Sequence, residues 1–474
     1  MAKPGYLIAP IKTDKMPPGV PFIVLNEAAE RFSFYGMNSI LVPFMTHHMM
    51  TASGAPDLFS PEKADAWYHT FASFVYYLPL VGAFLGDAVL GKYRTVFYLS
   101  IVYCFGHLGL ALNHTRAGLA VGLALIAMGA GGIKPCVSAN VGDQFGQSNQ
   151  HLLTRVFSWF YFSINFGSAF STLLIPWLLE PYRASPGLAA SLPSWAVGLL
   201  EKCHGPDIAF GTPGILMFLA TVVFWLGRRR FVHLPPAGAV NYFKEVVQKE
   251  NLKALGNLLI LVPFAAMFWA LWYQNFSSWV VQAEKMDRHL FGMEWKPAQI
   301  QTFNPVFILL MLPLFSYVIY PAIEKVVRLT PLRKMGMGLF VTAFAFVIVA
   351  LAQRRIDAGQ TPFILWQIAA FVVLTAGEIM VSVTHLEFAY TQAPRKMKSL
   401  VMCTYLGAVA LGNTFTAAVN FFIQNPDGTA KLSGASYFFF FVKVMLVTAV
   451  LFLFFARFYK GKTYIQQEVP SAPS

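Results

Sequence analysis

Charge is scarce in this chain. Only 12% of its 474 residues are Asp, Glu, Lys or Arg, whereas 56% are hydrophobic. Soluble globular domains carry about 25% charged residues, so the composition excludes an ordinary soluble domain of this size. Apolar runs of about 20 residues, the length that crosses the bilayer core, recur instead along the sequence. We therefore expect an all-α membrane protein embedded in a lipid bilayer.

Cysteine residues and sequence motifs typical of enzymes are also scarce. The four Cys residues form no close pair and show no metal-ligand spacing, so a disulfide framework and a metal centre are not expected. The N-terminal residues lack the apolar core and cleavage site of a signal peptide, so insertion is expected to depend on the first helix. No nucleophile–base spacing and no phosphate-binding loop are present. We expect neither an enzyme nor a bound cofactor.

The apolar runs predict about twelve membrane-spanning helices. They begin near Pro21, Ala64, Tyr93, Leu119, Thr154, Gly211, Leu258, Gln299, Met335, Pro362, Met397 and Tyr437.

The basic residues that give the net charge of +13 are distributed according to the expected membrane topology of these runs. Lys and Arg concentrate in alternate connections and in the tail. These positions are Lys92, Arg94, Arg228, Arg229, Arg230, Lys244, Lys249, Lys253, Lys325, Arg328, Arg333, Lys334, Arg395, Lys396, Lys398, Arg457, Lys460 and Lys462. This is the positive-inside pattern, which places both termini in the cytoplasm of a plasma or inner membrane. It also removes the reason to expect nucleic acid as a partner.

The longest basic connection, residues 228–257, divides the predicted spans six and six. We expect an N-terminal six-helix bundle in 1–227, a cytoplasmic linker in 228–257, and a C-terminal six-helix bundle with a cytoplasmic tail in 258–474. Because each span needs about 20 residues, the linker is too short for an additional two-helix insertion. The linker segment NYFKEVVQKENLKALG is typical of a short amphipathic surface helix.

The turn after the second span, GAFLGDAVLGKYRT, contains Asp87 and Lys92. It resembles the cytoplasmic loop signature of the major facilitator superfamily. Glu324 and Arg328 occupy the matching place in the second half. An ordinary charged turn is the alternative, but two parallel halves of six helices are the arrangement of that superfamily.

The first predicted span, VLNEAAERFSFYGMNSILVPF, contains Glu27, Glu30 and Arg31. Ionisable groups at membrane depth are costly and usually functional. Their spacing of three and four residues places them on one helix face, where two acids against one base leave a negative charge that can accept a proton. Lys134 lies in another apolar run, where Pro135 disfavours regular helix. A buried Lys needs an anion, and Glu27 and Glu30 are the nearest candidates. A purely structural ion pair is the alternative.

The run EAAERFSFYG resembles the E-x-x-E-R-F-x-x-Y-G motif of the proton-dependent oligopeptide transporter family. Four further segments resemble that family in the same order, namely GGIKPCVSANVGDQF, FSWFYFSINFGS, FWALWYQ and TAGEIMVSVTHLEFAYTQAP. The resemblance implies a major facilitator fold and proton-coupled symport of di- and tripeptides by alternating access. It implies no cofactor beyond the proton gradient. We expect the protein to function as a monomer, although the sequence itself does not give the oligomeric state.

The resemblance also assigns roles to individual residues. Arg31 and Lys134 would bind the peptide carboxylate, while Glu27 and Glu30 would take part in proton coupling. With both acids ionised we expect them to hold Arg31 and Lys134, and protonation of one would free a cation for the substrate. His69, in AWYHTFASFVYY, would also handle protons; an uninvolved His on the external side is the alternative.

Glu378 would bind the peptide amine, helped by Asn165 and Asn304. For either Asn, hydrogen bonding between helices is an equal alternative. Four aromatic residues would shape a tolerant side-chain pocket. They are Tyr35, Tyr76, Trp269 and Tyr405.

The chain departs from the family at two positions that commonly form an ionic external gate. Asn38 replaces an Arg and Tyr273 replaces an acid. Because the Arg and the acid are both absent, neither is left as a buried unpaired charge. This predicts a nonionic gate. Phe34 and Tyr405 also replace a common Tyr and Trp, which affects the peptide preference.

Other functions remain open alternatives. A family member that moves nitrate or an amino-acid conjugate is one, although Glu378 favours a substrate with an amine. A channel or a sensor that does not transport is another, and the intact acidic motif and Lys-Pro segment disfavour it.

Overall fold

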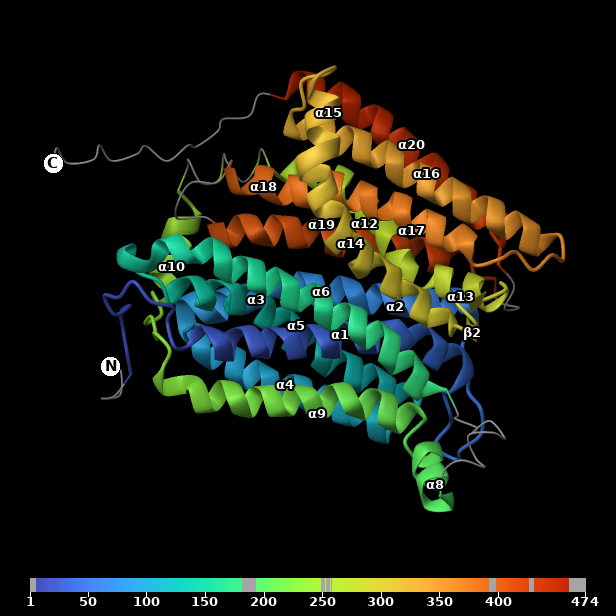
Figure 1. Cartoon of the computed structure of the whole chain (residues 1–474), viewed down its shortest axis with the longest axis horizontal. Helices are drawn as coiled ribbons and strands as arrows, with labels where there is room; N and C mark the ends of the chain where they lie inside the picture. Colours follow the sequence, from blue (N-terminus) through green and yellow to red (C-terminus); the bar gives the residue numbers. More distant parts are fainter. Residues whose placement is uncertain are drawn as a thin grey trace.

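The computed structural model describes residues 6–180, 193–248, 252, 256, 258–391, 398–425 and 430–459 (Figure 1). Helices dominate this part of the chain, and the strands that it contains form one small antiparallel hairpin of β1 (His289–Leu290) and β2 (Met293–Glu294). The all-α class that the apolar runs predict is confirmed.

The first half of the chain is built from long helices with short helical segments between them. These are α1 (Val20–His47), α2 (Pro61–Tyr77), α3 (Pro79–Phe84), the π-helical η1 (Leu85–Val89), α4 (Lys92–Leu112), α5 (Arg116–Asp143), η2 (Gln147–Leu152), α6 (Leu153–Leu179), α8 (Ser194–Lys202), α9 (Pro206–Leu226), η3 (Gly227–Arg229) and α10 (Ala239–Val246).

The second half contains more interrupted helices. These are α12 (Val262–Trp272), the 3-10 segment η4 (Tyr273–Phe276), α13 (Ser278–Glu284), η5 (Pro297–Thr302), α14 (Phe303–Leu314), the π-helical η6 (Phe315–Ile319), α15 (Tyr320–Glu324), α16 (Pro331–Asp357), α17 (Leu365–Glu378), the π-helical η7 (Ile379–Val383), α18 (Thr384–Thr391), α19 (Lys398–Ile423) and α20 (Ala435–Phe458).

Several helices begin where the sequence supplies a cap. The Ser60 side chain accepts a hydrogen bond from the backbone N–H of Lys63, and the Thr330 side chain does the same for Arg333. Pro follows each cap as the first helical residue, where its missing N–H has no cost. These local signals fix where α2 and α16 begin.

Pro135 does not break α5, which continues from Arg116 to Asp143. The expectation of irregular backbone at Lys134 is therefore wrong. Helices at membrane depth keep their form around Pro because neighbouring groups satisfy the backbone positions that it disturbs.

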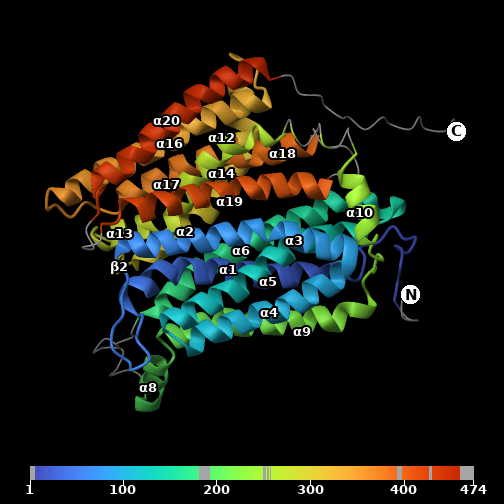
Figure 2. The same cartoon turned by 180° about the vertical axis from the view of Figure 1, so that it is seen from behind.

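The two halves lie side by side, with the blue to green helices on one side and the yellow to red helices on the other (Figures 1 and 2). Packing of α2 against α19 and of α6 against α14 joins them. Helix α10 lies at one end of the molecule, the α10 end. The β-hairpin, α13 and α8 lie at the opposite end, the hairpin end.

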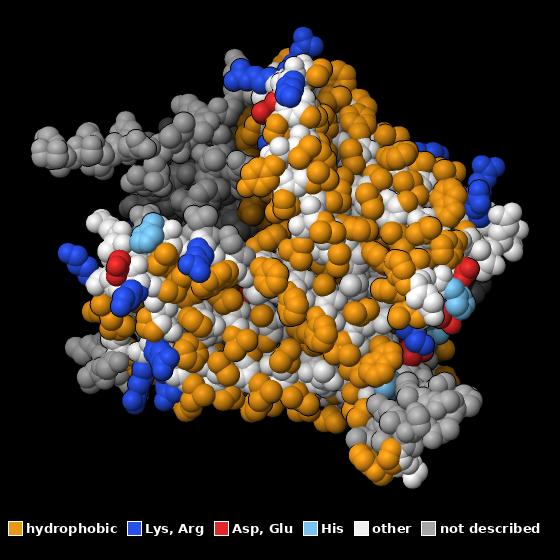
Figure 3. Space-filling view, in the orientation of Figure 1, with side chains coloured by type: hydrophobic (Ala, Val, Ile, Leu, Met, Phe, Trp, Pro, Cys, Tyr) orange, Lys and Arg blue, Asp and Glu red, His pale blue; other side chains and the backbone are white. Residues whose placement is uncertain are grey.

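Hydrophobic side chains cover the long sides of the helices in Figure 3, and Lys and Arg side chains gather toward the ends. Within the described residues, 10 helical segments are long and apolar enough to cross a bilayer. Helix α1, with its three charged residues, and the interrupted α12–α13 segment are not among them. The chain is a multi-pass membrane protein, and the count of twelve spans stays a prediction.

The predicted linker helix is represented by α10. Its Tyr242 and Phe243 rings pack 5.7 and 5.6 Å from the ring of Phe84, measured between centroids. This contact holds the start of the linker against the end of α3. Most of the predicted segment after residue 248 lies outside the described residues.

Candidate functional site

The charged face of α1 is buried and internally paired. Arg31 Nε lies 2.8 Å from Glu27 Oε1 and 2.7 Å from Glu30 Oε2. Relative exposures are 4% for Glu27, 0% for Glu30 and 7% for Arg31. The prediction that these three residues share one face is confirmed. Two carboxylates share one guanidinium, so this cluster holds an excess negative charge when both acids are ionised.

Lys134, on α5, does not join that ion pair. Its Nζ lies 4.0 Å from the centroid of the Phe34 ring and 4.1 Å from that of Tyr76. Among the described residues, no carboxylate approaches it within 4.0 Å. The expected contact with Glu27 and Glu30 is thus absent. Two ring faces take the place of the anion, since aromatic quadrupoles attract a desolvated ammonium.

Glu378 ends α17 in the other half of the chain. Its Oε2 accepts a hydrogen bond of 2.8 Å from the indole N–H of Trp272 and another of 2.8 Å from the Asn304 side chain. The same Asn304 amide lies 3.1 Å from the Thr375 hydroxyl. Within the described part of the chain, Glu378 has no cation within 4.0 Å. Neutral donors therefore orient this carboxyl group without supplying a cation to it.

Aromatic rings connect the Lys134 side to the Glu378 side. The Tyr76 ring, which Lys134 touches, lies 5.7 Å from the ring of Tyr273. Tyr273 in turn lies 5.0 Å from Trp272, the donor to Glu378. A positive group and a negative group thus stand at opposite ends of one aromatic series that crosses between the two halves.

The positions of the predicted nonionic gate are buried in aromatic surroundings. Tyr273 is 2% exposed, and Asn38 is fully buried. Beside them, Phe276 stacks 6.2 Å from Tyr35 and 6.5 Å from Tyr68, so rings from α1 and α2 meet η4 of the other half. The gate role of Asn38 and Tyr273 stays a prediction.

His69 is fully buried rather than exposed at the surface. Its Nδ1 lies 2.7 Å from Asn413 Oδ1, and its Nε2 lies 3.1 Å from Ser277 Oγ. It joins α2 to α19 and to the start of α13. It contacts none of the charged residues on α1, so the structure places it in a separate polar group.

The remaining predicted binding residues have neighbours of their own. Asn165 donates to the Tyr161 carbonyl in its own helix at 3.0 Å. The hydroxyls of Tyr405 and Ser382 are 2.8 Å apart. Trp269 lies edge-on to Tyr405 with centroids 6.0 Å apart. Their roles toward a substrate stay predictions.

Lys92, which follows η1, lies closer to another acidic residue than to Asp87, the partner that the sequence indicated. Lys92 Nζ lies 2.7 Å from Asp143 Oδ2 but 3.9 Å from Asp87 Oδ1. Asp143 ends α5, and a Lys at the start of α4 therefore ties two helix ends together. The sequence offered the signal, because Asp143 is the acid in the segment GGIKPCVSANVGDQF.

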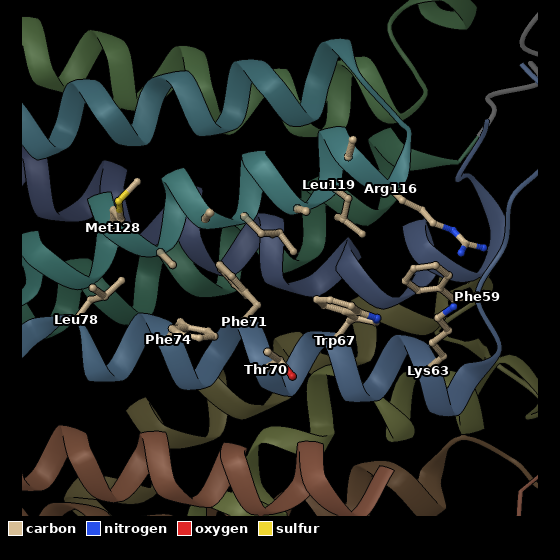
Figure 4. Close-up of a pocket in the computed structure, with 15 residues that line it drawn as sticks. Phe59, Lys63, Trp67, Thr70, Phe71, Phe74, Leu78, Arg116, Leu119 and Met128 are labelled. Atoms are coloured by element: carbon tan, nitrogen blue, oxygen red, sulfur yellow. The ribbon is translucent and has the colours of Figure 1, made fainter. Parts of the chain in front are cut away.

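A groove between α2 and α5 is separate from these residues (Figure 4). Its volume is about 630 Å³, and apolar side chains such as Trp67, Phe71 and Met128 line most of it. Lys63 and Arg116 stand at one end. None of the predicted site residues lines it, so it is not the candidate site.

Comparison with known proteins places the chain in a family. A family model described as the POT family matches residues 93–248 and 236–435. The charged motif of α1 precedes the matched region.

Curated relatives agree. The chain is 34% identical over 423 residues to solute carrier family 15 member 2 of Mus musculus, covering 75% of this chain and 54% of that protein. It is 37% identical over 385 residues to peptide transporter family 1 of Drosophila melanogaster, covering 72% of this chain and 48% of that protein. The chain therefore spans about half the length of the curated relatives it matches.

Solved structures give the same answer for the fold. The POT family transporter PepTSo has a TM-score of 0.80 and 34% identity, covering 94% of this chain and 99% of that one. A proton dependent oligopeptide (POT) family transporter has a TM-score of 0.72 and 33% identity, covering 91% and 100%. The predicted major facilitator fold is confirmed, and these structures are of transporters, not enzymes. The chain belongs to the POT family.

Proposed function

We propose that this chain is a proton-coupled symporter that imports di- and tripeptides by alternating access. The observation that carries the proposal is the separation of charge across the two halves. Arg31 and Lys134 lie in the first half, and Glu378, which has no cation among the described residues, lies in the second. A zwitterionic peptide has charges of the opposite sign at its two ends.

The carboxylate end of the peptide would meet the cations. Lys134 rests on two aromatic rings rather than on an acid, so it can reach a substrate carboxylate without breaking an ion pair. Arg31, in contrast, is engaged by two glutamates. We infer that Lys134 provides the first contact and that Arg31 joins when its own partners release it.

The amine end would meet Glu378. Trp272 and Asn304 both bind Oε2, which orients the carboxyl group and leaves it without a cationic partner among the described residues. An ammonium group would supply the full opposite charge that these neutral donors lack. This arrangement favours peptides over nitrate, which has no amine to offer.

Proton coupling follows from the shared guanidinium. Protonating Glu27 or Glu30 removes one of the two charges that hold Arg31. The freed cation is then available to the peptide carboxylate. Because both acids contact the same guanidinium, a change of charge on one alters how strongly Arg31 is held by the other.

The topology completes the proposal. We place the α10 end and both termini in the cytoplasm of a plasma or inner membrane, with bundles in 1–227 and 258–474 joined by the linker 228–257. The aromatic contacts of Phe276 and Tyr273 with α1 and α2 then form an external gate without ions. The monomer contains both halves of the site, and the proton gradient is the energy source.

Uptake into proteoliposomes tests the function. An imposed inward proton gradient should accumulate a labelled dipeptide, and excess unlabelled di- or tripeptide should compete. Collapsing the gradient with a protonophore is the control. Accumulation of nitrate instead, without dipeptide, would overturn the peptide assignment. Equilibration of dipeptide without accumulation would overturn the coupling.

A further inference from the structure

The groove between α2 and α5, here called the α2–α5 groove, lies on an outer face of the first half (Figure 4). Both helices belong to segments that are long and apolar enough to cross a bilayer. Three apolar side chains of the lining are partly exposed, namely Trp67 at 40%, Phe74 at 57% and Met128 at 43%. In a membrane protein such side chains face lipid, so the groove opens toward the bilayer.

Side chains of different size on the two helices create this groove. The α2 side carries Trp67, Phe71 and Phe74, whose spacing of three and four residues places them on one helix face. The α5 side carries four alanines, which are Ala117, Ala120, Ala124 and Ala127. Large rings beside small side chains leave about 630 Å³ of space. Apolar surface that faces an empty space loses dispersion contacts, so this shape favours an apolar chain that fills it.

The groove is long, and its middle is apolar. Its lining on α2 extends from Lys63 to Leu78, and a rise of about 1.5 Å per residue puts these positions about 22 Å apart. One leaflet supplies half of the hydrocarbon core of about 30 Å, so the groove is long enough for an acyl chain. The polar side chain between these ends is Thr70, whose hydroxyl donates to the Ala66 carbonyl at 2.8 Å. Its hydrogen bond is therefore satisfied within α2.

Two cations stand at the hairpin end of the groove. Lys63 Nζ lies 4.5 Å from the centroid of the Phe59 ring, and the guanidinium carbon of Arg116 lies 5.1 Å from the same centroid. In the described part of the chain, Lys63 has no carboxylate within 4.0 Å, while Arg116 is bound to Asp57. The neighbouring acid Glu62 lines a different pocket. Two cations and one acid leave positive charge at this end.

Trp67 follows Lys63 by one helical turn and lies between the cations and the apolar part of the groove. Trp is enriched where the hydrocarbon core meets the head groups, so this position marks the boundary between them. The Trp67 ring also lies edge-on to Phe421 of α19, with centroids 6.3 Å apart. Packing against the other half therefore helps to hold this wall of the groove in place.

From this geometry we infer that the α2–α5 groove binds one phospholipid from the leaflet at the hairpin end. Its phosphate would lie between Lys63 and Arg116, and one acyl chain would lie along the rings of α2. Charge complementarity selects this occupant, because Lys and Arg bind phosphate and the rest of the lining suits hydrocarbon. A phospholipid is likewise polar at one end only. The inference does not depend on the proposed transport activity.

A second apolar groove offers a comparison within the same molecule. It lies between α4 and α9, holds about 650 Å³ and is lined by apolar side chains such as Phe105, Phe218 and Trp225. No Lys or Arg is among the residues that line it. Acyl chains can cover either groove, but selection for a phosphate head group is expected only at the α2–α5 groove.

Three variants of the full chain test the site. Lys63→Gln removes the cation that has no acidic partner, and a double variant adds Arg116→Gln. Ala124→Phe fills the apolar part of the groove and leaves both cations in place. Lys285→Gln is the matched control, because Lys285 is an exposed Lys after α13, at the same end of the molecule, and does not line the groove.

The affinity of the first bound lipid is measured on purified protein in detergent by native mass spectrometry, with phosphatidylglycerol as the probe. Diacylglycerol with the same chains lacks the phosphate, and glycerol phosphate lacks the chains. We expect the wild type to bind phosphatidylglycerol at least tenfold more tightly than diacylglycerol, since charge-assisted hydrogen bonds are made only with the phosphate. Glycerol phosphate should not compete, because it brings no acyl chain to the groove.

The variants should separate the two parts of the site. Lys63→Gln should weaken phosphatidylglycerol binding by roughly tenfold, and the double variant should weaken it further, with little change for diacylglycerol. Ala124→Phe should weaken both lipids, because it occupies the space of the acyl chain. Lys285→Gln should keep the wild-type affinities.

Equal affinity of the wild type for phosphatidylglycerol and diacylglycerol would overturn the site, because lipid would then only cover an apolar surface. Wild-type affinity in both Lys63→Gln and Ala124→Phe would do the same. A dimer that excludes lipid would show that a second copy of the chain covers the groove. Because Arg116 also binds Asp57, its loss can destabilise the protein; where a melting curve shows this, Lys63→Gln and Ala124→Phe decide the question.

Discussion

The indole N–H of Trp272 donates to the Glu378 carboxylate at 2.8 Å, although 106 residues separate them in the chain. Trp272 lies at the end of α12, where the 3-10 segment η4 begins, and Glu378 lies where α17 gives way to η7. Each residue therefore sits at an interruption of a helix. The contact holds the carboxyl group in a fixed orientation without supplying a cation to it.

Replacing Trp272 by Phe should weaken binding of a free-amine dipeptide by roughly tenfold, because a hydrogen bond to a charged group contributes about 1.5–3 kcal/mol. Phe keeps the ring that packs against Tyr273. Competition binding on purified protein measures the effect. The N-acetylated form of the same dipeptide is the control, and its affinity should change little. An equal loss for both forms would mean that Trp272 acts through packing alone.

Glu30→Gln should abolish gradient-driven uptake and leave part of the dipeptide counterflow. Glu30 is fully buried and lies 2.7 Å from Arg31, so an amide there imitates the permanently protonated acid. The guanidinium then keeps only Glu27 as its anion. Proteoliposome uptake with and without a gradient separates the two activities. Driven uptake at the wild-type level would remove Glu30 from the coupling.

Local spacing predicted part of the site correctly. The positions of Glu27, Glu30 and Arg31 depend only on helical periodicity, and the structure pairs them as the spacing requires. The partner of Lys134 could not be found in this way. Phe34 lies on α1 and Tyr76 on α2, and their two ring faces compete with the acids for the same ammonium group.

Contacts between residues that are far apart in the chain could not be predicted from the sequence, for a related reason. Trp269 and Trp272 stand three residues apart, and only the packing of α12 against its neighbours selects the second as the donor to Glu378. The helices themselves followed from the apolar runs. Their interruptions, such as η4 and η7, did not, because a change from α to 3-10 or π geometry leaves hydropathy unchanged.

Lys134→Met should weaken binding of dipeptides that have a free carboxylate by tenfold or more, since a charge-assisted hydrogen bond is lost. The apolar Met chain can still lie on the rings of Phe34 and Tyr76. The fold should therefore be retained, which a melting curve in detergent checks. A C-terminally amidated dipeptide is the control, with little difference between variant and wild type. An equal loss for the amidated peptide would contradict the assigned contact.

Asp143→Asn should lower the melting temperature in detergent more than Asp87→Asn does. Lys92 lies 2.7 Å from Asp143 but 3.9 Å from Asp87, and these side chains are 18 to 28% exposed. Partial solvation keeps the expected difference to about 1 kcal/mol or less. Lys92→Met should remove the distinction between the two variants. A larger effect from Asp87 would show that its role does not depend on this ion pair.

The nonionic gate predicts a specific interaction between Asn38 and Tyr273. Asn38→Arg or Tyr273→Asp alone places an unpaired charge in a buried aromatic region, at a cost of about 3–5 kcal/mol. Introduced together, the two charges can pair. The double variant should therefore be more stable and more active than the summed free-energy changes of the two single variants predict. Melting curves and dipeptide uptake on all four proteins form the double-mutant cycle. Purely additive effects would mean that these residues do not face each other, and the gate would then rest on the ring contacts of Phe276 alone.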